Sequence, residues 1–451
     1  MATVVEPERQ KAAQPTYHEI TRDIAATLGR PSRAYFMLLA FVLAVLAFGV
    51  FALLWQVRWG LGVAGYTPPV MWGVYITTFV FWVGIAHSGT LISAILYLFR
   101  SAWRTSVYRT AEAMTVFAVL TAGLFPLIHL GRIWYAYWLF PYPNQRQLWV
   151  NFKSPLVWDV FAVSTYLTVS TLFLIVGLVP DVAAVREKAT GWRRKLYEVT
   201  SLGWRGTDQQ WRHYTRAYLY LAALATPLVL SVHSVVSWDF AMAIVPGWHA
   251  TIFAPYFVAG AIYSGVALVV TLLVPLRKVF KMERYITVEH FDNLAKLLLL
   301  TGMIVAYAYV VEYFLAWYSG NPFERDSFFN RAFGDYWWAT WTMITCNGFL
   351  PFLLFFRKIR RSIPALFVLS LFVNLGMWFE RFVIIVVSLS HEYDPYAMGH
   401  YTPSWVEWGI LAGSFAWFFL WFLLFAKNFP MVSITEVKEI IPMPRRGRRG
   451  S

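Results

Sequence analysis

The feature that most constrains this chain is a series of apolar stretches, most of about 20 residues or more, that recur along its whole length. An apolar helix of that length crosses the hydrocarbon core of a bilayer and satisfies its own backbone hydrogen bonds there. Charged residues make up only 14% of the chain, against about a quarter in soluble domains. The sequence therefore predicts an all-α polytopic membrane protein. The stretches are continuous, whereas the strands of a β-barrel alternate polar and apolar residues.

The positions of lysine and arginine test the number of spans and set their orientation. We predict about ten transmembrane helices, near residues 34–55, 68–99, 107–140, 155–185, 213–245, 248–276, 290–318, 335–356, 362–390 and 404–427. Of the 38 lysines and arginines, 30 fall at the two ends and in the alternate loops on the same side. The five opposite loops hold five, namely Arg58, Arg146, Lys153, Arg325 and Arg331. The positive-inside rule then places both termini in the cytoplasm.

The net charge of +14 does not indicate a nucleic-acid partner, because the basic residues lie in short loops between apolar runs. The single cysteine, Cys346, excludes an internal disulfide, a CxxC metal site and a CxxCH haem attachment. The polar first 33 residues show no cleavable signal peptide. The longest basic loop, 186–216, contains three tryptophans, and two readings of it fit equally well. It is either an interfacial helix in contact with lipid or a solvated loop.

A faint internal repeat relates two parts of the chain. Gly84-x-x-x-Ser88-Gly89 recurs as Gly260-x-x-x-Ser264-Gly265, and Asp159 meets Asp335 at the same offset of 176 residues. Small residues at such spacing let helices approach closely. We therefore predict two related four-helix bundles, 68–245 and 246–390. Outside them lie a cytoplasmic segment 1–33, a peripheral helix with an outer loop 34–67, an outer loop with a peripheral helix 391–427, and a basic tail 428–451.

Four ionisable residues are predicted at similar depth in the outer half of the membrane. His129 lies one or two turns before an aromatic span end; Asp159 is roughly 6 Å in, Asp239 roughly 10 Å and Arg381 roughly 15 Å, counted at about 1.5 Å per helical residue. Each singly has a structural alternative, such as helix capping, snorkelling or pairing between helices. Because ionisable groups inside a membrane are costly, their convergence predicts a functional site.

This set of side chains suits the oxidation of a quinol, which removes two electrons and two protons. His129 and Asp159 are the candidate proton acceptors, and Asp239 and Arg381 the further quinol-binding residues. Arg132 and Glu380 are candidates for a second tier around them. No metal site is expected.

A second group of polar residues lies deeper and could form a proton path across the membrane. Hydrogen bonding between helices is the alternative for each member. The group consists of His87, Glu112, His233, Asp292, Lys296 and Glu312. Intrinsic haem b is not expected, because a dihaem bundle uses two histidines on each of two helices. Here the mid-membrane histidines His87, His129 and His233 lie one to a span.

Three stretches make the chain resemble the NrfD/PsrC family of quinone-interacting membrane subunits. They are Trp82-Val-Gly-Ile-Ala-His-Ser-Gly-Thr-Leu-Ile-Ser93, the His129 and Asp159 pair, and Asn374-Leu-Gly-Met-Trp-Phe-Glu-Arg-Phe-Val-Ile384. The similarity covers nearly the whole chain, and within the family the likeness is greatest to the C subunit of bacterial alternative complex III.

The resemblance implies a menaquinol or ubiquinol substrate, oxidised near the periplasmic face of the bacterial cytoplasmic membrane. It implies no haem or iron–sulfur cluster in this chain. It also implies an iron–sulfur partner subunit, multi-haem cytochrome c subunits and a second, homologous membrane subunit. The family's pocket residues correspond to His129 and Asp159, and with them Asp239 and Arg381. Two alternatives stay open: a membrane subunit of a polysulfide or other molybdenum reductase, and a proton-coupled secondary transporter.

Overall fold

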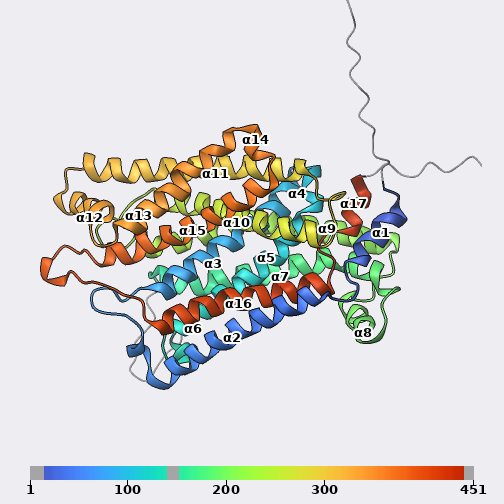
Figure 1. The fold of residues 1–451 in the computed structure, drawn as a ribbon, viewed down its shortest axis with the longest axis horizontal. Helices are drawn as coiled ribbons and strands as arrows, with labels where there is room; N and C mark the ends of the chain where they lie inside the picture. The colour runs from blue at the N-terminus through green and yellow to red at the C-terminus, as the bar shows by residue number, and fades with distance from the viewer. Residues whose placement is uncertain (1–14, 140–151, 441–451) are drawn as a thin grey trace, which may run out of the picture.

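The computed structural model describes residues 15–139 and 152–440 and shows a bundle of long, roughly parallel and antiparallel helices (Figure 1). In the described part, nine helical segments are long and apolar enough to cross a membrane. They are α2 (Arg33–Trp59), α3 with its continuation (Val74–Leu98), α5 and α6 (Tyr108–His129), α7 (Pro155–Arg186), α9 (Asp208–Ala241), α10 (Phe253–Val279), α11 (Val288–Tyr318), α15 with its continuation (Ile363–Val387) and α16 (Trp405–Asn428). The prediction of an all-helical polytopic membrane protein is confirmed. The predicted loop residue Arg146 lies outside the described residues.

The eighth predicted span, 335–356, is helical but irregular. It consists of α13 (Trp337–Met343), a π-helical stretch Ile344–Phe349 and a 3-10 stretch Leu350–Phe355. Pro351 supplies no amide hydrogen, so the backbone loses one helical hydrogen bond at the start of the 3-10 stretch. The segment therefore falls short of the length of uninterrupted helix that marks the other nine.

Shorter helices lie at the two ends of the bundle. The first and last described helices, α1 (Tyr17–Ala26) and α17 (Ile434–Ile440), contact each other at one end, where α8 (Gly191–Thr200) also lies (Figure 1). We call this the basic end, because most of the loop lysines and arginines lie there. The far end carries α12 (Pro322–Phe333) and the first residues of α7, α10 and α16.

The repeated glycine and serine motif lies where α3 and α10 pack together. A Cβ added at Gly84 would contact Ser264, and one added at Gly265 would lie 2.5 Å from the carbonyl oxygen of Ile85. The two backbones can approach this closely because side chains are absent at these positions. The α3–α10 contact thus joins a helix of the predicted first bundle to a helix of the predicted second, and the division into two related bundles stays a prediction.

Helices α2 and α16 form a separate pair along one edge of the bundle (Figure 1). Gly49 of α2 and Gly413 of α16 meet backbone to backbone. The outer side of α2 exposes Phe41, Phe51 and Leu54, which is the apolar surface that a helix facing lipid presents. The predicted basic loop 186–216 contains α8, so a helix forms there.

Candidate functional site

Two carboxyl groups from neighbouring helices meet near the far end. Asp159 is the fifth residue of α7, which begins at Pro155, and Asp239 lies two residues before α9 ends at Ala241. Their side chains lie within hydrogen-bonding reach of each other. The indoles of Trp158 and Trp238, one position earlier in each helix, contact with ring centroids 5.9 Å apart. Because a carboxylate cannot donate, two carboxyl groups this close form a hydrogen bond only when the pair carries one proton.

The site has hydrogen-bonding capacity that the described residues do not use. The Oδ1 atoms of Asp159 and Asp239 and the Nδ1 atom of His129 are buried, and none has a hydrogen-bond partner within the described ranges. Buried polar atoms are rarely left unpaired, so such groups call for a functional explanation. A small molecule carrying hydroxyl or carbonyl groups could satisfy them. That His129 and Asp159 contact the same molecule stays a prediction.

His129 ends α6 and lies beside a cluster of tyrosines that the sequence analysis missed. The ring of Tyr66 is perpendicular to the His129 ring at a centroid distance of 5.8 Å, and it also contacts the rings of Tyr75 and Tyr401. Aromatic rings at such spacing give flat, largely apolar walls. Tyr66 lies in the loop before α3 and Tyr401 in the loop before α16, so hydropathy alone gave no signal for either residue.

Gln56 of α2 connects this tyrosine cluster to α6. Its Nε2 donates to the carbonyl oxygen of Ile128 at 2.8 Å, and its Oε1 accepts from the hydroxyl of Tyr75 at 2.5 Å. Gln56 is fully buried, so both of its polar atoms need these partners. The sequence signal that could have identified Gln56 is its side-chain amide directly after an apolar span. Gln56 fixes the carbonyl next to His129, and the peripheral helix therefore helps to position the site.

Arg381 is already paired within its own helix. Its Nη1 lies 2.7 Å from Oε1 of Glu380, and its guanidinium lies over the ring of Phe257 at 4.4 Å. Glu380 also accepts a hydrogen bond from the hydroxyl of Tyr309. Among the described residues no ion pair joins Arg381 to Asp159 or Asp239. The predicted role of Arg381 in quinol binding stays a prediction, and the carboxylate that it directly neutralises is Glu380.

A model of the family described as "Polysulphide reductase, NrfD" matches residues 62–390, nearly three quarters of the chain. This chain belongs to the NrfD family. It is 28% identical over 424 residues to a putative membrane C subunit of the dimethyl sulfoxide reductase of Halobacterium salinarum, covering 87% of this chain and 90% of the relative.

Two further relatives are more distant. The C subunit of the selenate reductase of Mesobacillus selenatarsenatis is 24% identical over 84% of this chain and 90% of its own length. The Hdr-like menaquinol oxidoreductase integral membrane subunit of Archaeoglobus fulgidus is 21% identical over 90% of this chain and 96% of its own length. The predicted family is therefore confirmed. The likeness to one particular subunit type within it stays a prediction.

Arg132 lies at the surface of the far end of this NrfD protein. With Leu54, Val57, Arg58 and Trp134 it lines a hollow of about 400 Å³. Its guanidinium lies 6.0 Å from the ring centroid of Trp134. This hollow adjoins the end of α6 that carries His129, so Arg132 could contact a polar group of a molecule that enters beside α2.

The predicted proton-path residues form separate groups. His87 of α3 and His233 of α9 meet in the centre of the bundle, with ring centroids 4.7 Å apart, and His87 stacks on Tyr166 at 4.8 Å. The Nε2 of His87 and both ring nitrogens of His233 have no hydrogen-bond partner in the part of the chain described. The sequence analysis assigned the two histidines to different spans and did not predict their contact.

Glu112 belongs to a buried ion-pair group nearer the basic end. It accepts a hydrogen bond from the hydroxyl of Tyr218 at 3.0 Å and lies 3.4 Å from Arg109, whose Nη2 contacts Asp181 at 2.9 Å. Arg109 and Asp181 are both fully buried, and the sequence analysis missed both. The sequence signal that could have identified Asp181 is its place directly after Pro180, at the end of an apolar span.

The remaining members lie apart from these two groups. Asp292 pairs with Lys296 at 3.1 Å and with Arg360 at 2.7 Å, at the basic end of α11. Glu312 is buried nearer the other end of α11, within electrostatic range of Arg331. No continuous chain of hydrogen bonds between described residues joins the four groups. The ion pairs around Asp292 suit a structural role, and the proton path stays a prediction. In the described ranges no group of three or more metal-ligating side chains is present.

Proposed function

We propose that this chain is the quinol-binding and quinol-oxidising membrane subunit of a multi-subunit quinol:acceptor oxidoreductase, of the type of alternative complex III. The observation that carries the proposal is the carboxyl pair of Asp159 and Asp239, with buried oxygens that have no partner among the described residues, at the end of the bundle where His129 lies beside Tyr66. The names of the three relatives describe membrane subunits of oxidoreductases, and one of them names menaquinol.

In this proposal the side chains of the site accept the protons that a quinol releases. Oxidation of one quinol to a quinone yields two electrons and two protons. The carboxyl pair, which holds one proton in its hydrogen bond, can take up one more, and the neutral imidazole of His129 can take up the other. Because both acceptors lie near the far end, the protons leave on that side. The buried Oδ1 atoms of the pair and the tyrosine walls keep water from the reacting hydroxyls.

The electrons pass to a partner subunit that carries an iron–sulfur cluster, and onward through multi-haem cytochrome c subunits. This chain itself binds no haem or cluster and is accompanied by a second, homologous membrane subunit. By the positive-inside rule the basic end faces the cytoplasm, and both chain ends with it, in a bacterial cytoplasmic membrane. The far end, with the site, faces the periplasm. The groups around His87, Glu112 and Glu312 are candidates for proton movement across the membrane.

A second candidate function uses the same site with a different electron acceptor. Two of the relatives are named as subunits of reductases, of dimethyl sulfoxide and of selenate. A chain that delivers quinol electrons to a molybdenum reductase would need the same hydrogen-bonding groups for the quinol. A third candidate, a proton-coupled transporter, rests on the buried charges alone.

Purification of the native complex in mild detergent tests these candidates together. The proposal expects a cluster-containing subunit, a visible haem spectrum and oxidation of added quinol. A molybdenum subunit and loss of the haem spectrum would favour the reductase. Solute uptake by the chain alone in liposomes would favour the transporter. If His129→Ala and Asp159→Asn both leave quinol oxidation unchanged in an intact complex, the site assignment fails.

A further inference from the structure

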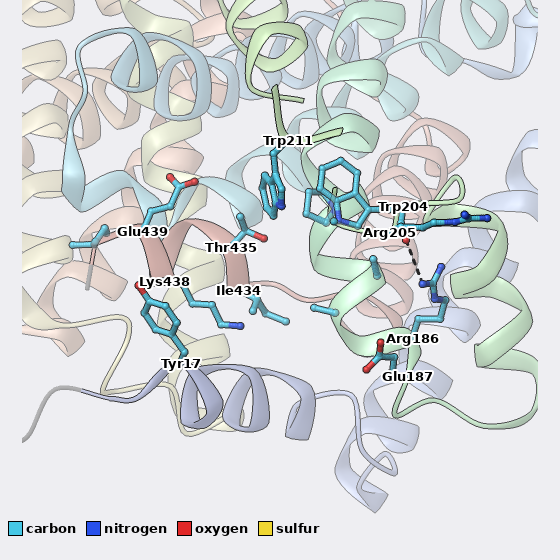
Figure 2. Close-up of a pocket in the computed structure, with 15 residues that line it drawn as sticks. Tyr17, Arg186, Glu187, Trp204, Arg205, Trp211, Ile434, Thr435, Lys438 and Glu439 are labelled. Atoms are coloured by element: carbon cyan, nitrogen blue, oxygen red, sulfur yellow. Dashed lines mark hydrogen bonds between the residues drawn. The ribbon is translucent and has the colours of Figure 1, made fainter. Parts of the chain in front are cut away.

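A cavity of about 820 Å³ opens at the basic end, far from the carboxyl pair (Figure 2). Its walls come from the last turns of α7, the turn between α8 and α9, α17 and the start of α1. Its lining residues are of three kinds: basic and acidic groups, aromatic rings, and short apolar side chains. Those that matter here are Arg186, Arg205, Lys438, Tyr17, Trp204 and Trp211.

Two of the cations that line this cavity have no salt-bridge partner among the described residues. The guanidinium of Arg186 is fixed by the hydroxyl of Ser201 at 2.9 Å and the carbonyl of Trp204 at 3.3 Å (Figure 2). Burial lowers the pKa of the Lys438 ammonium, as expected for a charge removed from water. No ion pair between described residues involves Arg186 or Lys438. Glu187 and Glu439 also line the cavity, so the three cations exceed the anions by one.

The wall formed by α17 is firmly attached, so the cavity is a fixed feature of the fold. Glu436 pairs with Arg104 at 2.6 Å, with both side chains only 6% exposed. The backbone and side chain of Thr435 both donate to Oδ1 of Asp181, at 2.9 and 2.8 Å. These contacts fix the helix that carries Lys438 against α7. Lys438 therefore keeps its place relative to Arg186.

Beside the cavity, α8 and the turn after it expose large apolar side chains. Trp192 is 62% exposed, Val199 73% and Leu202 69%. Trp192 and Val199 are seven residues apart and so share one face of the helix. Leu202 adopts a left-handed backbone conformation with φ of 46°, which is unfavourable for a leucine. The fold therefore accepts strain at a residue whose side chain points away from the protein, next to the basic residues 193–195.

We propose that this cavity binds the headgroup of an acidic phospholipid from the cytoplasmic leaflet, with the apolar face of α8 lying in the membrane interface. Arg186 and Lys438, on different walls of the cavity (Figure 2), attract the anionic headgroup by their charge, and the indoles of Trp204 and Trp211 lie at the level of the headgroups. Basic pockets at the cytoplasmic ends of transmembrane helices suit such headgroups, and tryptophan favours the interface. A free phosphate would use the two cations but would leave the exposed Trp192, Val199 and Leu202 without a role.

Native mass spectrometry of the delipidated complex tests the proposal, with phosphatidylglycerol and phosphatidylcholine titrated separately. The double variant Arg186→Gln/Lys438→Gln is compared with Arg194→Gln/Lys195→Gln, which removes the same charge from exposed positions outside the cavity. We expect the first to weaken phosphatidylglycerol binding about 25-fold, or about 5-fold for each charge removed. The second should stay within about 2-fold of the parent.

Three outcomes would overturn the proposal: equal loss in the two double variants, equal binding of phosphatidylcholine, or displacement of the lipid by inorganic phosphate at a matching concentration. The last would identify a free-anion site instead. Because Arg186 also holds Ser201, the single variant Lys438→Gln is measured as well, with thermal unfolding as a check of the fold. It should weaken phosphatidylglycerol binding about 5-fold with an unchanged unfolding temperature. This inference does not depend on quinol chemistry, so its failure would leave the proposed function intact.

Discussion

Replacing Asp159 by asparagine is the sharpest test of the carboxyl pair. The asparagine amide has nearly the same shape and can still donate to Asp239, so the contact between α7 and α9 and the assembly of the complex should survive. The asparagine amide cannot accept a proton from the quinol. It also donates to Asp239 and so makes that carboxylate a weaker acceptor. General base catalysis typically contributes 10²- to 10⁴-fold, so turnover should fall by about 100-fold or more, about 2.7 kcal/mol.

The matched control comes from the internal repeat. Asp335 lies 176 residues after Asp159, the offset of the predicted repeat, but its side chain is 78% exposed and pairs with His400 at 3.4 Å. Exposed pairs of this kind contribute about 0–1 kcal/mol to stability. Asp335→Asn should therefore change turnover by less than about 2-fold.

The assay is steady-state oxidation of a soluble quinol analogue by the assembled complex, with kcat and KM measured separately. Because the two carboxyl groups share a proton and act as a unit, the double variant Asp159→Asn/Asp239→Asn should be at most about 10-fold worse than Asp159→Asn alone. Retention of more than about a third of the parent kcat in Asp159→Asn would refute the reasoning. A loss in Asp335→Asn equal to that in Asp159→Asn would refute it too.

Three further predictions concern the imidazole and the packing of the helices. His129→Gln should lower quinol turnover about 100-fold, because one proton acceptor is lost; turnover at the parent rate in an intact complex would exclude His129 from the site. Gly265→Ala should destabilise the protein by about 1–3 kcal/mol, because its Cβ meets the backbone of α3. Gly62→Ala, which has open space around it, should leave the thermal unfolding temperature unchanged. Glu436→Ala leaves Arg104 buried without its partner, at a cost of about 3–5 kcal/mol. Hydrogen exchange should then rise selectively in α17, and protection equal to the parent's would contradict this.

Much of the fold could be predicted from the sequence, because few backbone conformations can cross a membrane. Apolar length gave the nine regular spans, and the separation of basic from other loops gave an alternation that the helix directions in the structure follow. Small residues at Gly84 and Gly265 marked a close helix contact correctly. Nothing in the sequence indicated that span 335–356 is irregular, because π and 3-10 stretches have the same apolar composition as an α-helix.

The candidate site was partly predictable for the same reason. Counting residues from a helix end gives depth, and depth brought Asp159 and Asp239 to one level. Depth says nothing about which helices are neighbours or how each is rotated about its axis. Arg381 was placed with these carboxylates by depth, yet its ion-pair partner is Glu380.

What the sequence by itself determined about this protein is where each side chain lies along the membrane normal, because transfer of apolar groups from water to lipid fixes that coordinate. The tertiary structure alone decided which side chains meet across it. The contact between His87 and His233, the attachment of Gln56 to the carbonyl beside His129, and the burial of Arg109 with Asp181 all depend on side-by-side packing. Packing between helices in lipid is set by shape and by a few polar contacts rather than by hydrophobicity, so hydropathy carries no information about it.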